Sequence, residues 1–154
     1  MNKTLYIIFL LSCLNSFSQD TLTYDEVAEE KIIFTEKAPA PIGPYNQAVL
    51  VNDILYTSGQ IALHPETMEL ILDDIETETK QVMENMKAVL EAADMTFDNV
   101  IKTTIFIMNM GDFARINSVY GSYFDEKTAP ARETVQVACL PKNVNVEISM
   151  IAVK

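Results

Sequence analysis

Two charged side chains near the end of the chain could together serve a small charged substrate. Arg132 stands at the start of an apolar, β-branched run, and Glu147 is the single carboxylate of a second such run. A guanidinium stays charged at every relevant pH and can hold a carboxylate through two parallel hydrogen bonds. A carboxylate within reach of a bound water can take its proton. Taken singly, each residue would more often be a solvated or ion-paired surface group.

The two groups are expected on neighbouring strands. The first run lies within residues 129–142 and the second covers residues 144–153, and both are rich in the β-branched residues that strands favour. Alternation along the first strand places Glu133 on the face opposite to Arg132, whereas a Glu133 turned inward would compete for the guanidinium. Cys139 of the same strand is expected to be a buried small hydrophobe rather than a nucleophile.

Three shorter strands are expected ahead of these two. Residues 32–34 form the first, and residues 45–51 and 54–58 form a hairpin around a tight turn at residues 52–53. The intervening residues 38–44 contain three prolines and a glycine, which favour a loop. The first part of the domain is therefore expected to contain strands and loops alone.

Two helices and one more strand are expected between the hairpin and Arg132. Apolar residues recur at helical spacing from about residue 74 to residue 93, and Asp73 with Glu76 has the form of a capping box at the start. Residues 100–108 form an apolar β-branched run, which predicts a strand. Asp112 then precedes a second helical pattern and is expected to cap it.

The second helix carries one polar residue within its apolar stripe. Phe113, Ile116, Tyr120 and Phe124 share one face at helical spacing, and Asn117 falls on that same face. A polar group in such a position needs a hydrogen-bond partner. Asn117 is therefore either a satisfied core amide or an amide that faces a substrate.

This order of elements predicts an α+β domain, with both helices on one face of a mixed or largely antiparallel sheet. The last two predicted strands are apolar on both faces, and helices on one side cannot cover both. An uncovered apolar face is typical of a subunit interface. The pattern therefore predicts a homo-oligomer.

Composition limits the partners that this domain can have. The chain has 154 residues, of which 49% are hydrophobic, so a single domain with a packed core is expected. Its formal net charge of −11 makes nucleic acid and anionic membranes poor partners. No clustered set of His, Cys and Asp residues indicates a metal site.

The first thirty residues differ in character from the rest. Residues 1–18 have the layout of a secretory signal peptide, with a basic start, a short apolar run and small residues before Gln19. Residues 19–30 are acidic and predict a tether, so the domain would cover residues 31–154. Export to the periplasm or medium is expected. In the alternative, Cys13 belongs to a lipobox and its lipid would attach the protein to a membrane.

Several short motifs occur together from about Lys31 to Lys154, in the order and spacing of one known family: residues 42–48 and 58–61, Asn85, Asp112 to Ala114 with Asn117 and Tyr120, residues 130–132, 140–141 and 146–148. They resemble the RidA (YjgF) family of reactive-intermediate deaminases. The resemblance implies a chorismate-mutase-like fold with a six-stranded mixed sheet, and a homotrimer with clefts between subunits. It also implies hydrolysis of 2-imino acids such as 2-iminobutanoate and 2-iminopropanoate, or their enamine tautomers, to 2-keto acids and ammonia, with no metal or organic cofactor.

The same resemblance assigns roles to individual residues. Arg132 would hold the substrate carboxylate, and Glu147 would position or activate water. Thr134 stands where many members have Cys, and its similar size should fit. The residues implied to bind the substrate are Tyr45, Ser58, Gly59, Asn117 and Thr134.

Two other functions stay open on the sequence alone. A non-catalytic trimer could use the same clefts to bind a small carboxylate or to shield unfolded protein, and both Glu133 and the predicted export favour that alternative. Ribonuclease activity is less well supported, because the net charge is −11 and His64 is the sole histidine.

Overall fold

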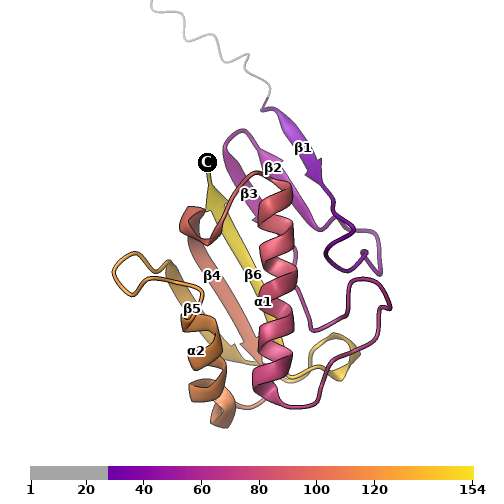
Figure 1. Cartoon of the computed structure of the whole chain (residues 1–154), viewed down its shortest axis with the longest axis vertical. Coiled ribbons are helices and arrows are strands. Elements are labelled where there is room, and N and C mark those ends of the chain that lie inside the picture. The colour runs from indigo at the N-terminus through magenta and orange to yellow at the C-terminus, as the bar shows by residue number, and fades with distance from the viewer. Residues whose placement is uncertain (1–27) are drawn as a thin grey trace, which may run out of the picture.

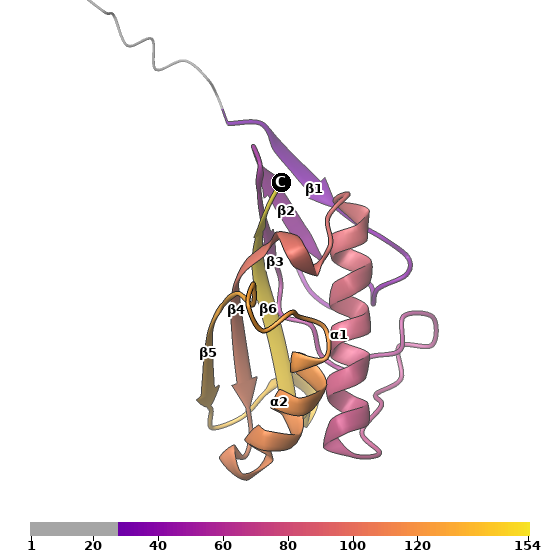
Figure 2. The same cartoon turned by 60° about the vertical axis from the view of Figure 1, so that its left-hand side comes forward.

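The computed structural model describes residues 28–154, and it shows a six-stranded sheet with two helices on one face (Figures 1 and 2). This confirms the predicted α+β class and the mixed sheet. The strands are β1 (Glu30–Ile33), β2 (Ala48–Val51), β3 (Ile54–Thr57), β4 (Val100–Ile107), β5 (Ala131–Gln136) and β6 (Val146–Val153). The helices are α1 (Ile75–Ala92) and α2 (Phe113–Gly121), with short 3-10 turns η1 (Phe97–Asn99), η2 (Met110–Asp112) and η3 (Pro141–Asn143).

The predicted leader, residues 1–18, lies outside the described residues. Most of the predicted tether, residues 19–30, lies outside them as well, and β1 already begins at Glu30. Within the described part of the chain, no helix is both long and apolar enough to cross a membrane.

The strand order is β1-β2-β3-β6-β4-β5, and only β4 and β5 run parallel. The prediction that the strand of Arg132 pairs with the strand of Glu147 is therefore wrong. The chain between β4 and β5 includes α2, and a helical crossover of this kind joins parallel neighbours. As a result, β5 pairs with β4 at the sheet edge, and β6 pairs with the other side of β4.

The first predicted strand of that pair is also shorter than expected. It ends at Gln136, and the chain then leaves the sheet before the η3 turn. Cys139 lies in this irregular segment and is exposed, contrary to the expected burial. The next residue, Leu140, is the one in this segment that packs into a core, beside Val144, and Cys139 is left exposed.

The hairpin of β2 and β3 agrees with its prediction. Val51 pairs with Ile54 across the two-residue turn. Asn52 has a φ of 52° there, in the left-handed region that asparagine tolerates better than most residues. The position of this tight turn was therefore predicted correctly from the sequence.

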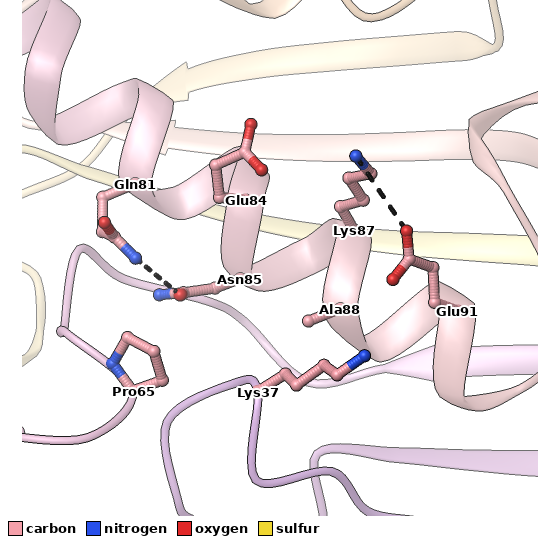
Figure 3. A pocket seen from close by; sticks show the side chains of 8 residues that line it. All are labelled: Lys37, Pro65, Gln81, Glu84, Asn85, Lys87, Ala88 and Glu91. Carbon is pink, nitrogen blue, oxygen red and sulfur yellow. Dashed lines mark hydrogen bonds and ion pairs between the residues drawn. The ribbon is translucent and has the colours of Figure 1, made fainter.

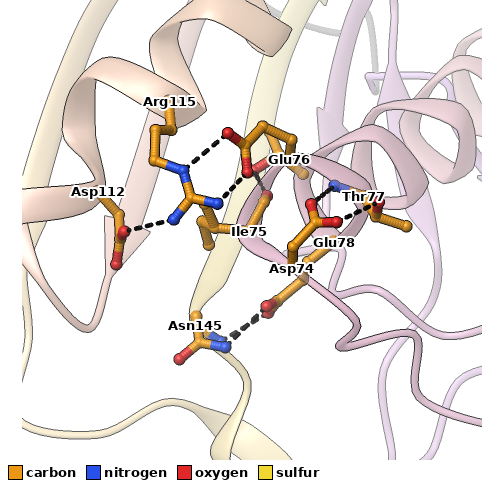
Figure 4. Close-up of polar contacts among 9 residues, drawn as sticks. Asp74, Ile75, Glu76, Thr77, Glu78, Asp112, Arg115 and Asn145 are labelled. Carbon is orange, nitrogen blue, oxygen red and sulfur yellow. Dashed lines mark hydrogen bonds and ion pairs between the residues drawn. The ribbon is translucent and has the colours of Figure 1, made fainter.

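Both helix starts differ from their predicted caps (Figure 4). The cap of α1 is Asp74 rather than Asp73, because the Asp74 carboxylate accepts a hydrogen bond of 2.8 Å from the Thr77 N–H. Asp112 makes no capping hydrogen bond to α2. Its carboxylate instead accepts a hydrogen bond of 3.3 Å from Arg115, which also pairs with Glu76 of α1. Arg115 of α2 thus links the starts of the two helices, because it pairs with Glu76 of α1 as well as with Asp112.

The core lies between the helices and the sheet, and β6 shows the division clearly. Its residues at even positions, Val146, Ile148, Met150 and Ala152, are buried beneath the helices. A buried carboxylate fixes the start of this strand: Glu78 of α1 accepts hydrogen bonds from the Asn145 N–H at 2.6 Å and from the Asn145 side-chain amide at 2.8 Å (Figure 4). Every second residue of β6, beginning with Glu147, then faces away from the helices.

The face of the sheet opposite the helices is partly apolar and exposed; below it is called the open face. Ile32, Tyr56 and Val135 lie on it with 57%, 46% and 44% of their surface exposed. This is the face that the sequence pattern predicts another subunit to cover. The trimer itself stays a prediction.

Candidate functional site

Arg132 of β5 lies on the helix-covered side of the sheet, at its edge. Its Nη1 donates a hydrogen bond of 2.7 Å to the Asn117 side-chain oxygen of α2. The guanidinium carbon lies 4.9 Å from the centre of the Tyr120 ring and 5.8 Å from that of the Phe113 ring. Phe113, Asn117 and Tyr120 are spaced four and three residues apart, so they share one face of α2. Arg132 thus rests against a single helix face.

The positive charge of Arg132 is left available to a ligand. Among the ion pairs found within residues 28–154, none involves Arg132. A guanidinium has five N–H donors, and the hydrogen bond to Asn117 uses one of them. Asn117 itself is exposed, so it is not the satisfied core amide that one of the two alternatives proposed.

Glu133 does not compete for this charge. Its carboxylate lies on the open face, where it accepts a hydrogen bond of 2.8 Å from the Thr104 hydroxyl and pairs with the Lys102 ammonium at 2.8 Å. The Lys102 ammonium, with help from Thr104, holds the pKa of Glu133 below its usual range. The predicted alternation of Arg132 and Glu133 is therefore confirmed.

Thr134 lies two residues beyond Arg132 on β5 and so on the same side of the sheet. It is half-buried and pairs in register with Ile105 of β4. We call Asn117, Arg132 and Thr134 the arginine half-site. All three belong to α2 and β5, which follow one another in the chain, and β5 forms the edge of the sheet beside β4 (Figure 2).

Glu147 lies on the open face and packs directly over Gly59. A Cβ atom built on Gly59 would lie 1.9 Å from the Glu147 Oε1 and 2.8 Å from its carboxyl carbon. With the carboxylate in this position, only a residue without a side chain fits below it. The carboxylate is half-buried, and this burial raises the pKa of Glu147 above its ordinary value of 4.5. A base with a raised pKa works closer to neutral pH.

The end of β3 is fixed against β6 beside this carboxylate. Gln60 and Ile148 exchange backbone hydrogen bonds of 2.8 and 3.1 Å, one residue from Gly59 and Glu147 respectively. The Ser58 hydroxyl donates a hydrogen bond of 2.6 Å to the Asn46 carbonyl. We call Ser58, Gly59 and Glu147 the glutamate half-site.

Tyr45 lies on the loop that Ser58 holds in place. Its side chain is 45% exposed, and its phenol oxygen accepts a hydrogen bond of 3.2 Å from the Ile42 N–H of the same loop. Buried Gln47 anchors the loop by accepting from the Thr35 N–H at 2.7 Å and donating to the Pro39 carbonyl at 2.9 Å. The Ser58 hydrogen bond to the Asn46 carbonyl thus links this loop, at the residue after Tyr45, to the glutamate half-site.

The two half-sites face opposite sides of one sheet. On β4, Thr103 is the register partner of Arg132 and Phe106 is that of Glu147. These partners are three residues apart, and an odd spacing along a strand reverses the face. Two strand spacings and three residues of rise separate the backbones by roughly 14 Å. The structure thus assembles each half-site but does not bring Arg132 and Glu147 to one hollow within a single chain.

A shallow hollow elsewhere on the surface contains none of these residues. It lies on the outer side of α1, between Lys37, Pro65, Asn85 and Glu91 (Figure 3). The Asn85 amide there donates hydrogen bonds to the Ile61 and Leu63 carbonyls, so it holds a loop rather than a ligand. Within residues 28–154, no group of three or more acidic, His or Cys side chains is placed to hold a metal ion.

Sequence reasoning missed two residues that contact Arg132. Both were assigned to an apolar stripe. Tyr120 is buried in the core as expected, whereas Phe113 is 38% exposed, and both rings lie beside the guanidinium. The signal was present in their spacing, because Asn117 lies between them on the same helix face.

Comparison with known proteins extends these observations. Residues 35–154 match the sequence model of the family described as Endoribonuclease L-PSP. The RutC family protein slr0709 of Synechocystis is 55% identical over 124 residues, which are 80% of this chain and 95% of that protein. The mouse protein named 2-iminobutanoate/2-iminopropanoate deaminase is 45% identical over 124 residues, which are 80% of this chain and 91% of that protein.

Solved structures of similar sequence have the same fold as this chain. The crystal structure of RidA from an Antarctic Psychrobacter has a TM-score of 0.77 and 43% identity, and it covers 80% of this chain and 99% of that one. The structure of Escherichia coli TdcF with bound serine has a TM-score of 0.76 and 46% identity, and it covers 80% of this chain and 98% of that one.

The expectation of a signal peptide and a secreted protein is corrected by the same comparisons. The alignment with slr0709 uses 95% of that protein, and the alignment with a RutC family protein of Pyrococcus horikoshii uses 98% of it, while each covers only 80% or 81% of this chain. These relatives consist of little besides the domain, so they lend no support to export as a property of the family. Lipidation of Cys13, outside the described residues, stays an untested alternative.

Proposed function

Because this chain belongs to the Endoribonuclease L-PSP family, also called RidA or YjgF, we propose that it hydrolyses 2-imino acids or their enamine tautomers to 2-keto acids and ammonia. One relative, from mouse, is named for this activity. Another, TdcF of E. coli, was crystallised with serine, which like the proposed substrates is a small molecule with a carboxylate beside a nitrogen-bearing carbon. The observation that carries the proposal is the pair of half-sites, a guanidinium that has no ion pair among residues 28–154 and a half-buried carboxylate of raised pKa.

The opposite placement of these half-sites leads us to infer that two chains complete each site. In a homotrimer, the edge formed by α2 and β5 of one chain would meet the open face of the next, so that Arg132 and a neighbour's Glu147 face the same cleft. The exposed apolar residues of the open face, such as Ile32 and Tyr56, would supply the buried area that a stable contact needs.

The proposed reaction begins with binding of the substrate carboxylate. The free N–H donors of Arg132 hold it bidentately, which fixes the imine carbon relative to the glutamate half-site. Water and imine are the only reactants. No atom of the substrate is oxidised or reduced during the hydrolysis.

Glu147 then moves the protons of the hydrolysis. The substrate reacts as its protonated iminium. The Glu147 carboxylate takes a proton from water as the water oxygen bonds to the imine carbon, which leaves a hydroxyl group and a neutral amino group on that carbon. The protonated Glu147 then gives its proton to the amino nitrogen, and the carbon–nitrogen bond breaks. The hydroxyl proton passes to the departing ammonia as the carbonyl of the 2-keto acid forms, so ammonium leaves and Glu147 is again ionised. One water is consumed for each ammonia released.

The direct test is turnover of freshly generated 2-iminobutanoate by the full-length protein, followed through the fall in imine and the rise in 2-oxobutanoate. We expect initial rates proportional to protein concentration, and loss of at least about a hundredfold in kcat/KM for Arg132→Ala and for Glu147→Gln. Full activity in either variant would remove that residue from the mechanism. Both variants must first be shown to keep the parent's oligomeric state.

A non-catalytic carboxylate-binding trimer is the second candidate, because the arginine half-site is already complete within one chain. This candidate predicts a different result for the parent protein and the Arg132→Ala variant. 2-Oxobutanoate would raise the Tm of the protein and the effect would vanish in Arg132→Ala, but imine decay would not depend on protein concentration.

A further inference from the structure

We propose that Phe113 and Tyr120 are positioning residues, whose rings hold the guanidinium of Arg132 at the sheet edge so that its free donors face the incoming carboxylate. This inference rests on the proposed role of Arg132 as the carboxylate clamp and adds two residues to that site. Neither ring is required to touch the substrate.

The first observation is the contact itself. The guanidinium carbon lies 4.9 Å from the Tyr120 ring centre and 5.8 Å from the Phe113 ring centre, within the range at which a cation is attracted to an aromatic face. The Asn117 oxygen takes one N–H between them. Arg132 is otherwise an exposed side chain on an edge strand, where a long flexible chain would sample many rotamers.

The second observation is that Tyr120 cannot move freely. Its phenol donates a hydrogen bond of 3.1 Å to the Thr103 hydroxyl, and Thr103 is itself the register partner of Arg132. Strand pairing, hydrogen bond and ring contact therefore close a small loop of three residues. Tyr120 is only 4% exposed, so its ring offers a fixed surface rather than a mobile one.

The third observation is the support behind the Tyr120 ring. Tyr120 packs at 4.7 Å on Phe124, which meets Phe97 at 5.3 Å, and Phe97 meets Tyr123 at 5.2 Å, all measured between ring centres. Phe97 belongs to η1, so this cluster fixes the end of α2 against the turn that leads into β4. A clamp whose side chain is already ordered loses less freedom when its ligand binds, so the rings should act on affinity.

The decisive variant is Phe113→Leu, because it removes an exposed aromatic face while keeping an apolar side chain. We expect the Kd for 2-oxobutanoate, measured by calorimetry on the full-length protein, to rise roughly three- to thirtyfold, with a parallel rise in KM and a kcat within about twofold of the parent. Phe113→Tyr keeps the ring and should restore Kd and KM to within about twofold. Phe97→Leu makes the same change in the supporting cluster, away from Arg132, and should lower Tm with a smaller effect on Kd.

A second measurement does not depend on the reaction. In the nitrogen-15 spectrum of arginine side chains, the Arg132 Nε–H signal, assigned by its loss in Arg132→Lys, should show a ring-current shift. The shift should shrink in Phe113→Leu and persist in Phe113→Tyr. An unchanged signal and an unchanged Kd in Phe113→Leu would overturn the proposal, as would equal impairment of the Leu and Tyr variants. If the parent protein neither binds nor turns over the test molecules, the proposed function fails, and the spectrum alone then decides whether the rings position Arg132.

Discussion

Arg132 and Glu147 point to opposite faces of the same sheet, because their register partners on β4, Thr103 and Phe106, are separated by an odd number of residues. Each group is well placed within its own half-site. The distance between them is bridged only if chains associate, which makes the proposed chemistry sensitive to how subunits are mixed.

Mixing two inactive variants should restore activity. In a cyclic trimer of Arg132→Ala and Glu147→Gln chains, every mixed assembly has one cleft with an intact arginine and an intact glutamate from adjacent chains. Random mixing at equal amounts should therefore recover about a quarter of parental activity. The measurement is 2-iminobutanoate turnover after the variants are unfolded and refolded together. Separately refolded and then combined samples serve as control, and no recovery on co-refolding, with the parent regaining full activity by the same procedure, would contradict a site shared between two chains.

Replacing Gly59 with Ala should displace the catalytic carboxylate. The new Cβ would lie 1.9 Å from the Glu147 Oε1, so the side chain must rotate away from its place. We expect kcat to fall about tenfold or more with little change in KM, since carboxylate binding is left intact. Gly121→Ala is the matched control, because nothing lies within 4 Å of a Cβ at that position. Equal kcat values for both variants would contradict this role of Gly59.

The pH dependence of the reaction should show the state of Glu147. The carboxylate must be ionised to accept a proton from water, and burial raises its pKa above the ordinary 4.5. The rate should therefore decline as the pH falls through this raised pKa, with a midpoint above 4.5 in a plot of log kcat/KM against pH. A profile flat down to pH 4.5 would argue against Glu147 as the base.

The raised pKa of Glu147 also makes the stability of the folded protein depend on pH. A folded-state pKa above that of the unfolded chain means that the folded state binds the proton more tightly, so stability is lost as the pH rises from about 4.5 through the raised value. Glu147→Gln cannot ionise and should melt at a higher temperature than the parent at pH 7. The difference should shrink as the pH is lowered below 4.5.

Glu133 should be dispensable for the reaction. Its carboxylate is held by Lys102 and Thr104 on the open face, away from Arg132. Glu133→Ser should leave KM for 2-iminobutanoate within about twofold of the parent, because the charge it removes does not contact the guanidinium. A several-fold fall in KM would mean that Glu133 competes with the substrate. The affinity between subunits, measured by dilution, is the property on which we expect this variant to act.

Glu78 should matter for folding. The buried Glu78 carboxylate accepts hydrogen bonds from three groups: the backbone N–H and side-chain amide of Asn145, and the backbone N–H of Val146. Removing the carboxylate leaves all three without their acceptor. Glu78→Ala should lower the free energy of unfolding by about 2–4 kcal/mol in urea titrations at fixed protein concentration. Glu91→Ala, which removes an exposed carboxylate 4.0 Å from Lys87, should cost less than about 0.5 kcal/mol. Similar losses for both would show that burial of Glu78 carries no special weight.

The elements themselves could be predicted from local patterns. The turn at Asn52 and Asp53, and the period of α1, are properties of short stretches, and the structure places them where the sequence indicates. The partner of β5 could not be predicted in this way. Residues 131–136 fit the edge of β4 or the edge of β6 equally well by composition, and the α2 crossover decides between them.

The candidate site was predictable as a set of residues but not as an arrangement. Motifs identified Arg132 and Glu147, whereas the face that each side chain points to depends on register, which is set by strand order. The aromatic contacts of Arg132 were missed for a related reason. An aromatic residue at helical spacing looks the same in sequence whether its ring packs into a core or against a guanidinium. Phe113 packs against the Arg132 guanidinium at the margin of the core.

The division of the site between the edge of β5 and the open face has a consequence for gene duplication. If assembly occurs as proposed, a duplicated gene could lose its arginine in one copy and its glutamate in the other and still keep about a quarter of its working clefts, since the co-assembled products form them. From then on neither gene could be deleted. The placement of two residues on opposite faces of one sheet would thus favour the evolution of obligate heteromers from this ancestor.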